Sequence, residues 1–320
     1  MRKALEAGML AAAMAMAVPA QAAQAALTQA NAALQSGEAD LALALLVSLT
    51  PSAESHNLAC RVRLTLEQWE AAADECERAV SQDGQTSDYH LWLGRALGEK
   101  AERASFLSAY SLAKRVRTEF ETAARLNPRN AEALADLGEF YDTAPGIVGG
   151  GDNKALGVAS QLDSVDPARA HELRGRIAEG RKDYATAERE FKQAITASEY
   201  PAFQWMTLAS FYRRRTRWTD LDAAMQNGVK AAEHDRREGV ALYDGASLLI
   251  TAKRNPELAA KLLQSYLAGS FKSEEAPAFV AHTKLARLKA QLGDLAGAQH
   301  ERAAALQLAH DYRPAQDLKF

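Results

Sequence analysis

The stretch Tyr184-x-x-Ala187-x-x-x-Phe191-x-x-Ala194, followed by Trp205-x-x-Leu208-Ala209-x-x-Tyr212, decides how this chain folds. Related phrases recur along the sequence with a period of about 34 residues. The spacing places large and small apolar side chains on one stripe of each of two consecutive helices. Because one helix pair cannot bury its stripe alone, we expect neighbouring pairs to stack into a solenoid.

Small residues recur where the helices are expected to cross. Gly94, Gly138, Gly175 and Ala209 stand at corresponding points of four first helices. A larger side chain there would overpack the crossing, at a cost of about 1–3 kcal/mol. The full order, a large residue, a small one and an aromatic in the first helix and then Gly-x-aromatic-x-x-Ala-x-x-x-aromatic-x-x-Ala, resembles the tetratricopeptide repeat (TPR).

The resemblance covers nearly all of the chain after residue 22. It implies an all-α, right-handed superhelical solenoid of about eight helix-turn-helix pairs over residues 23–320. It also implies a non-catalytic protein that binds a protein or peptide in its concave groove. The phrase Ala-Pro-Gly-Ile-Val-Gly-Gly-Gly at 144–151 resembles a loop of uncharacterised bacterial exported TPR proteins.

Two insertions interrupt the period. About ten extra residues fall near 101–117 and about five near 143–152, each between the first and second helix of its pair. Adjacent pairs place that connection on the same edge, so we expect the two insertions to touch. They could build a binding face, or they could only pack together and stiffen the bend.

The N-terminus has the pattern of a secretory signal peptide. Met1-Arg2-Lys3 precedes an uncharged run over 7–18, and Pro19-Ala20-Gln21-Ala22 predicts cleavage after Ala22. An Ala-rich helix of the mature protein is the alternative. No later run reaches the roughly 18 apolar residues that a membrane span needs. We therefore expect an exported, periplasmic protein without stable membrane insertion.

The charge is close to balanced, with a formal net value of −3. A balanced charge does not indicate a nucleic-acid-binding surface. The one basic run contains Arg213, Arg214, Arg215 and Arg217. At helical spacing it is typical of a solvated face, and a polyanion site is the alternative.

The sequence offers no constellation for catalysis, a metal or a cofactor. The Gly-rich run 146–154 lacks the Gly-Lys-Ser/Thr of a phosphate loop, and we expect Asp152 and Asn153 to cap a helix there. No two histidines have metal-ligand spacing. Four of them fall at the large position of a first helix, where packing is the expected role: His56, His90, His171 and His282.

The two cysteines, Cys60 and Cys76, fall on faces that the repeat brings together. A disulfide is one interpretation, and two buried free thiols used as small apolar residues are the other.

The groove residues follow from the repeat register. One equivalent position holds Asn31, Arg61, Arg95, Glu139, Arg176, Ser210, Ser247 and Arg287, with Trp92, Asp136, Leu173, Phe203, Met206, Tyr243 and Lys284 on the same surface. Repeated arginines among aromatics suit an extended peptide or a C-terminal carboxylate, which Arg grips with two hydrogen bonds. Alternatively, Arg serves here only as a soluble helix residue. The predicted partner-binding residues are Trp92, Arg95, Asp136, Glu139, Arg176, Phe203, Met206, Tyr243 and Arg287.

We therefore predict an exported scaffold or adaptor in cell-envelope assembly. One alternative is a self-assembling structural solenoid, a homo-oligomer. The other is a cell-wall carbohydrate-binding module or enzyme, whose site would lie on the insertion edge near Tyr110, Tyr141 and Asp142.

Overall fold

The computed structural model describes residues 21–234 and 239–320, and within these ranges the secondary structure is helical throughout. Most of the expected leader, residues 1–20, lies outside the described residues. The first helices of eight consecutive pairs are 21–36, α3 (Ala53–Thr65), α5 (Ser87–Arg103), α7 (Ala131–Thr143), α9 (Pro167–Gly180), α11 (Ala202–Arg214), α13 (Gly239–Ala252) and α15 (Ala278–Gln291). The second helices are α2 (Ala39–Val47), α4 (Trp69–Gln82), α6 (Phe106–Leu126), α8 (Asp152–Leu162), α10 (Tyr184–Ala197), α12 (Trp218–Ala232), α14 (Pro256–Ala268) and α16 (Leu295–Leu308).

This order confirms the predicted all-α solenoid of stacked pairs. A short α17 (Arg313–Gln316) follows the last pair. Among the helices described, none is long and apolar enough to cross a bilayer.

Local capping signals set where several helices begin. Asp166 accepts a hydrogen bond from the backbone of Arg169, with Pro167 at the first helical position of α9. Asn255 and Pro256 open α14 in the same way. At α8 the expectation of Asp152 and Asn153 as caps is wrong. Gly151 is the N-cap and Asp152 the first helical residue, because left-handed backbone at Gly149 and Gly151 turns the chain into the helix.

The crossing within a pair is filled in two ways. In the third and fifth pairs a glycine meets an aromatic ring: a Cβ at Gly94 would lie 2.4 Å from Cε1 of Phe120, and one at Gly175 would lie 2.8 Å from Cε1 of Phe191. In the second pair Cys60 and Cys76 occupy the equivalent positions and form a disulfide, with their Cα atoms 5.3 Å apart. The cysteines therefore replace an apolar contact by a covalent one.

Each of the four first-helix histidines binds a glutamate of its own second helix. Nδ1 lies 2.6 Å from a carboxylate oxygen in His56–Glu75, His90–Glu119 and His282–Glu301, and 2.8 Å in His171–Glu190. Three of the pairs are separated by 19 residues and the His90 pair by 29. The difference equals the expected insertion of about ten residues. These histidines therefore contribute a hydrogen bond to a carboxylate as well as packing volume.

The first insertion lengthens two helices, whereas the second forms a loop. α5 and α6 run for 17 and 21 residues and are separated by Ala104 and Ser105 alone. The second insertion holds the 3-10 helix η1 (Gly146–Val148). The two insertions contact each other, since Nη1 of Arg117 donates to the carbonyl of Val148 over 3.1 Å.

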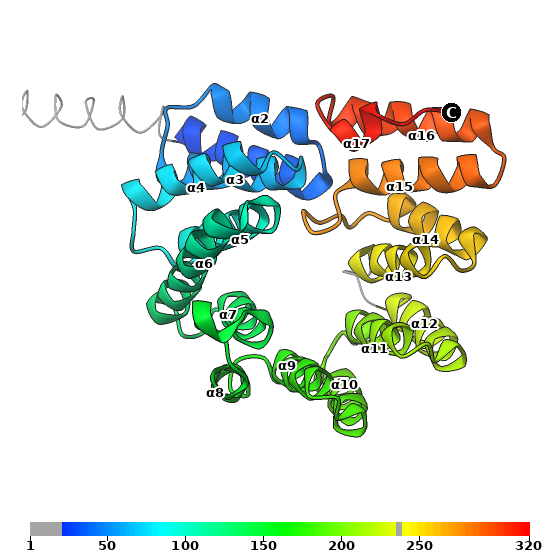
Figure 1. Cartoon of the computed structure of the whole chain (residues 1–320). Coiled ribbons are helices and arrows are strands. Elements are labelled where there is room, and N and C mark those ends of the chain that lie inside the picture. Colours follow the sequence, from blue (N-terminus) through cyan, green and yellow to red (C-terminus); the bar gives the residue numbers. More distant parts are fainter. Residues whose placement is uncertain (1–20, 235–238) are drawn as a thin grey trace, which may run out of the picture.

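The two ends of the solenoid lie side by side, so that the helices describe a closed ring (Figure 1). Residues of the first pair, Leu27 and Leu34 among them, share one apolar core with Phe279 and Tyr312. Polar contacts continue the junction: Nε of Arg61 donates to Glu274 over 2.9 Å, and the backbone N–H of His310 donates to Asp40 over 2.9 Å. The junction leaves no room for a side chain at Gly37, because a Cβ there would lie 2.4 Å from the backbone nitrogen of Ala278.

Candidate functional site

The first helices line the inside of the ring and most of the second helices lie outside it (Figure 1). Two neighbouring pockets open on this inner surface. One, of about 660 Å³, is lined by α9, α11 and α13 with Asp142 of α7. The other, of about 680 Å³, is lined by α5, α7, α9, α11 and the segment 271–275. Arg176 and Phe203 line both pockets, and we call the two together the inner surface.

The repeat register places most of the predicted partner-binding residues on or beside this surface. Arg95, Asp136, Glu139, Arg176 and Phe203 line the second pocket, and Met206 lines the first. Arg287 and Tyr243 line a smaller adjoining pocket near the junction of the two ends.

Trp92 lies beneath two of the arginines. The guanidinium carbons of Arg61 and Arg95 lie 5.1 and 4.5 Å from its ring centroid. This distance is typical of a cation–π contact. The Trp92 ring therefore contacts Arg61 and Arg95 of the same chain.

Arg95 is occupied by carboxylates of the next pair. Its Nε donates to Asp136 over 2.6 Å, and its Nη2 donates to Glu132 over 3.0 Å. Both acids belong to α7, so the arginine joins the first helices of the third and fourth pairs. Burial raises the pKa of Asp136, and the charge of Arg95 opposes that shift.

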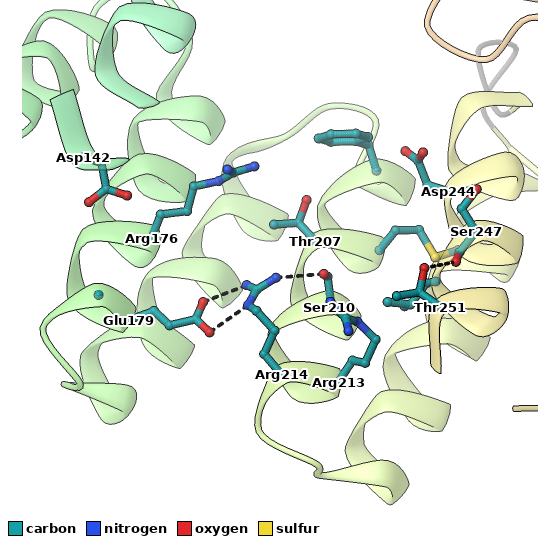
Figure 2. A pocket seen from close by; sticks show the side chains of 14 residues that line it. Asp142, Arg176, Glu179, Thr207, Ser210, Arg213, Arg214, Asp244, Ser247 and Thr251 are labelled. Carbon is teal, nitrogen blue, oxygen red and sulfur yellow. Dashed lines mark hydrogen bonds and ion pairs between the residues drawn. The ribbon is translucent and has the colours of Figure 1, made fainter. Parts of the chain in front are cut away.

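Arg176 and Arg214 repeat the arrangement further along the ring. Arg176 donates to Glu139 over 2.9 Å and to Glu172 over 3.1 Å. Arg214 grips Glu179 with two hydrogen bonds of 2.8 and 2.7 Å (Figure 2). Arg95 and Arg176, which the register predicts as a grip for a partner's carboxylate, thus hold carboxylates of this chain, and Arg214 does the same.

Two further basic side chains that the register places on this surface also have partners within the chain. Arg287 donates to the carbonyl of Pro314, and Lys284 donates to Ser247 over 2.7 Å. The ammonium of Lys284 lies 4.1 Å from the ring centroid of Tyr243. Burial lowers the pKa of Lys284 to about 8.

Three carboxylates of the inner surface differ from the rest. Within the described part of the chain, the side chains of Asp142, Asp244 and Glu275 make no hydrogen bond and no ion pair. Burial, reinforced by the charge of Glu275, raises the pKa of Asp244 to about 7. Burial also raises the pKa of Asp142 and of Glu275, with the neighbouring charges of Asp152 and Glu132 adding to the shift.

Two further polar side chains of the surface have unused hydrogen-bonding groups. Gln204 of α11 lines the second pocket and is only 9 % exposed, and its Oε1 is without a partner in the described structure. In the first pocket, Nε of Arg213 is also buried and has no hydrogen-bond partner in the described structure. Figure 2 shows Asp142 and Asp244 on opposite walls of the first pocket, with side chains of α11 between them.

The other candidate sites of the sequence do not assemble. Lys154, which follows the Gly-rich run, donates to the carbonyl of Gly149. On the insertion edge, Tyr141 donates to Glu121 over 2.8 Å, whereas Asp142 lines the inner surface. Over residues 21–234 and 239–320, no cluster of three His, Cys, Asp or Glu side chains could hold a metal ion.

Sequence reasoning missed the residues that are left unpaired. Gln204, Asp244 and Glu275 belong to no motif, and whether they are paired depends on which neighbouring side chains reach them. The His–Glu pairs were detectable, since a separation of 19 residues repeats at three of the four histidines. Nothing in the sequence signals that the ends meet.

Comparison with known proteins identifies the fold. Neither the known family models nor the curated proteins include a match to this chain. A thermophilic TPR protein of Thermus thermophilus, TTC0263, is similar in structure with a TM-score of 0.50 and 16% identity, over 59% of this chain and 98% of that one. A TPR protein of Parabacteroides merdae gives a TM-score of 0.45 and 13% identity, over 84% of this chain and 99% of that one. The likeness to TTC0263, together with the stacked helix pairs, shows that the chain has the tetratricopeptide-repeat fold.

Proposed function

We propose that this protein is a non-catalytic, exported scaffold that binds a protein or peptide partner on its inner surface. The observation that carries the proposal is the continuity of that surface. Two pockets joined at Arg176 and Phe203 extend from α5 to α13, across first helices of five consecutive pairs. A surface that is long, open and polar, with exposed aromatic side chains, suits an extended chain.

Phe203 is the strongest candidate for a direct contact. It lines both pockets and 41 % of it is exposed, so it packs on the protein only in part. Aromatic side chains in such positions contribute a large share of binding energy at interfaces.

The proposed compartment is the bacterial periplasm, with a role in envelope assembly. Support comes from the leader-like sequence of residues 1–22 and from the Cys60–Cys76 disulfide. Structural disulfides persist in oxidising compartments and are rare in the cytosol.

Self-assembly through free ends is the weaker alternative. The first pair and the last pair bury apolar residues against each other, Phe279 and Tyr312 included. A second copy would have to displace this contact before it could extend the solenoid.

The test uses a photo-crosslinking amino acid at position 203 of the full chain, in cells that make the protein. The crosslinked partner is identified, purified and titrated against the wild type and two variants. Phe203→Ala should weaken the complex about tenfold, since a buried aromatic contact contributes about 1.5 kcal/mol or more. Phe106→Ala is the matched control, because Phe106 is 86 % exposed at the start of α6 and lines neither pocket.

A partner whose affinity falls with Phe203→Ala and not with Phe106→Ala supports the proposal. Equal affinity for all three proteins would contradict it, as would a partner that crosslinks from position 106 and not from 203.

A further inference from the structure

The inner surface carries more acid than base. Nine carboxylates and five arginines line the two pockets together, and no lysine lines either. This surplus is opposite to what a row of arginines suggests from the sequence.

Internal pairing uses the positive charges first. Arg95, Arg176 and Arg214 are held by hydrogen-bonded carboxylates, and Arg169 lies 3.3 Å from Asp166. Arg213 is the one arginine of the surface for which the described structure shows no ion pair. Against it stand three unpaired carboxylates, so the charge that the surface can offer to a ligand is negative.

An independent feature of the same surface is a buried polar group without a hydrogen-bond partner. Gln204 is buried to nine-tenths beside the second pocket and its Oε1 lacks a partner in the described residues. An unsatisfied buried amide costs about 1–3 kcal/mol unless something binds it. A side-chain amide offers one acceptor and two donors, which match the N–H and C=O groups of a peptide backbone.

The exposed aromatic side chains of the inner surface also favour a cationic ligand. Phe203 and Phe271 line the second pocket and are 41 % and 36 % exposed. Ring faces attract ammonium and guanidinium groups, with the strongest effect where water is displaced.

We infer that the partner presents an extended peptide segment rich in Lys and Arg, bound along the inner surface by Asp142, Asp244 and Glu275, with Gln204 on its backbone. The inference rests on the proposed function and names the chemistry of its partner. The three carboxylates lie on α7, on α13 and in the segment after α14. Their spread over separate elements suits a chain with several cationic side chains better than a single small cation.

The experiment titrates the purified full chain with fluorescent ten-residue peptides. One carries four spaced Arg or Lys residues, a second has Glu at those positions and a third has Gln. We expect the basic peptide to bind, with an affinity that falls as salt rises, and the Glu peptide to be excluded. Asp244→Asn/Glu275→Gln should weaken the basic peptide by about tenfold or more, since hydrogen bonds to charged groups contribute about 1.5–3 kcal/mol each.

The matched control is Asp74→Asn/Glu102→Gln, which removes the same charge from exposed carboxylates that line neither pocket. Spermine competes as a small polycation, and a photo-reactive basic peptide reports the helices that it touches. Gln204→Met should weaken the peptide several-fold and leave spermine unaffected, because it removes an amide and no charge.

Loss of affinity in the inner-surface variant alone, with crosslinks to α7, α9, α11 or α13, would support the inference. Equal weakening by the control variant, or preference for the Glu or Gln peptide, would overturn it. So would spermine binding as tightly as the basic peptide. If the Glu or Gln peptide binds more tightly than the basic one and Phe203→Ala weakens that binding, the charge inference fails while the proposed function stands. If peptides of every charge fail to bind and the cellular partner does not crosslink from position 203, both fail.

Discussion

Arg95 and Asp244 both face the inside of the ring from first helices, yet they are in opposite states. Arg95 is held by two carboxylates of the neighbouring pair, at 2.6 and 3.0 Å. Asp244 lies among polar side chains of the first pocket without an ion pair in the described structure. We refer to the stretch around Arg95, Arg176 and Arg214 as the paired region, and to Asp142, Asp244 and Glu275 as the unpaired region.

The difference separates two roles that one surface can have. In the paired region, ion pairs cross from one repeat to the next and fix the curvature of the ring. In the unpaired region, buried carboxylates are left without a cation. Burial raises the pKa of each, so ionisation costs stability, and the carboxylates are available to a cationic ligand. Membership of the inner surface therefore does not by itself make a residue a binding residue.

The largest expected effect comes from breaking the paired region with Arg95→Ala. This substitution leaves Asp136 and Glu132 without their cation and removes the contact with Trp92. We expect a loss of about 3 kcal/mol in the free energy of unfolding, measured by urea denaturation. Affinity for a basic peptide should rise, since two more carboxylates become free.

Arg103→Ala serves as the control. Like Arg95, Arg103 lies over a tryptophan ring, 4.2 Å from the centroid of Trp69, but its ion pair with Glu99 is an exposed i,i+4 pair. We therefore expect a loss of about 1 kcal/mol or less. If Arg95→Ala weakened the basic peptide while the helix content stayed the same, Arg95 would belong to the binding site and the comparison would fail.

The next largest expected effect is that of Asp244→Asn on how the free energy of unfolding depends on pH. In the folded protein Asp244 has a pKa of about 7, above its ordinary value of 3.8, and it faces Glu275, Lys284 and Glu172. Between these pH values the folded chain keeps a proton that the unfolded chain has lost, so Asp244 lowers stability as pH rises through this window. The variant should be more stable than the wild type at pH 8, by on the order of 2 kcal/mol.

Urea denaturation of both proteins from pH 5 to pH 8.5 checks this, because titrating groups that do not interact with Asp244 cancel in the difference. A difference that stays constant across the range would show that Asp244 is charged and well solvated in the folded state.

The smallest expected effect is that of Gln204→Met on stability. The substitution replaces an unsatisfied buried amide by an apolar side chain of similar length, so we expect unchanged stability or a gain of up to about 1 kcal/mol. The matched control is Gln193→Met, at a site on the outer helix α10. A loss above about 1 kcal/mol for Gln204→Met would mean that the amide is already satisfied within the fold.

The repeat register predicts which residues lie on the inner surface, but it does not predict which side chains they bind. Arg95, Arg176 and Phe203 lie on the inner surface because a period of about 34 residues fixes which face of each helix turns inward. Asp136 lies 41 residues after Arg95 and Glu139 lies 37 residues before Arg176, each on a neighbouring first helix, so these contacts depend on the angle between repeats. The sequence pattern carries no measure of that angle.

Closure of the ring shows the same limit on a larger scale. Gln35 and Glu274 form a hydrogen bond across 239 residues, a contact that results from small rotations added over every repeat. Cys60 and Cys76, in contrast, lie within one pair, and the sequence placed them together correctly while leaving their oxidation state open. Local geometry is encoded in the repeat, and cumulative geometry is not.

The most direct test of the account is a crystal structure of the full chain with the basic ten-residue peptide. We predict a Lys or Arg side chain of the peptide within about 4 Å of Asp142, Asp244 or Glu275, and Arg95 still bound to Asp136. A peptide that lies on the outer helices, or one that displaces Arg95 or Arg176 from their carboxylates while the three unpaired acids stay empty, would contradict the account.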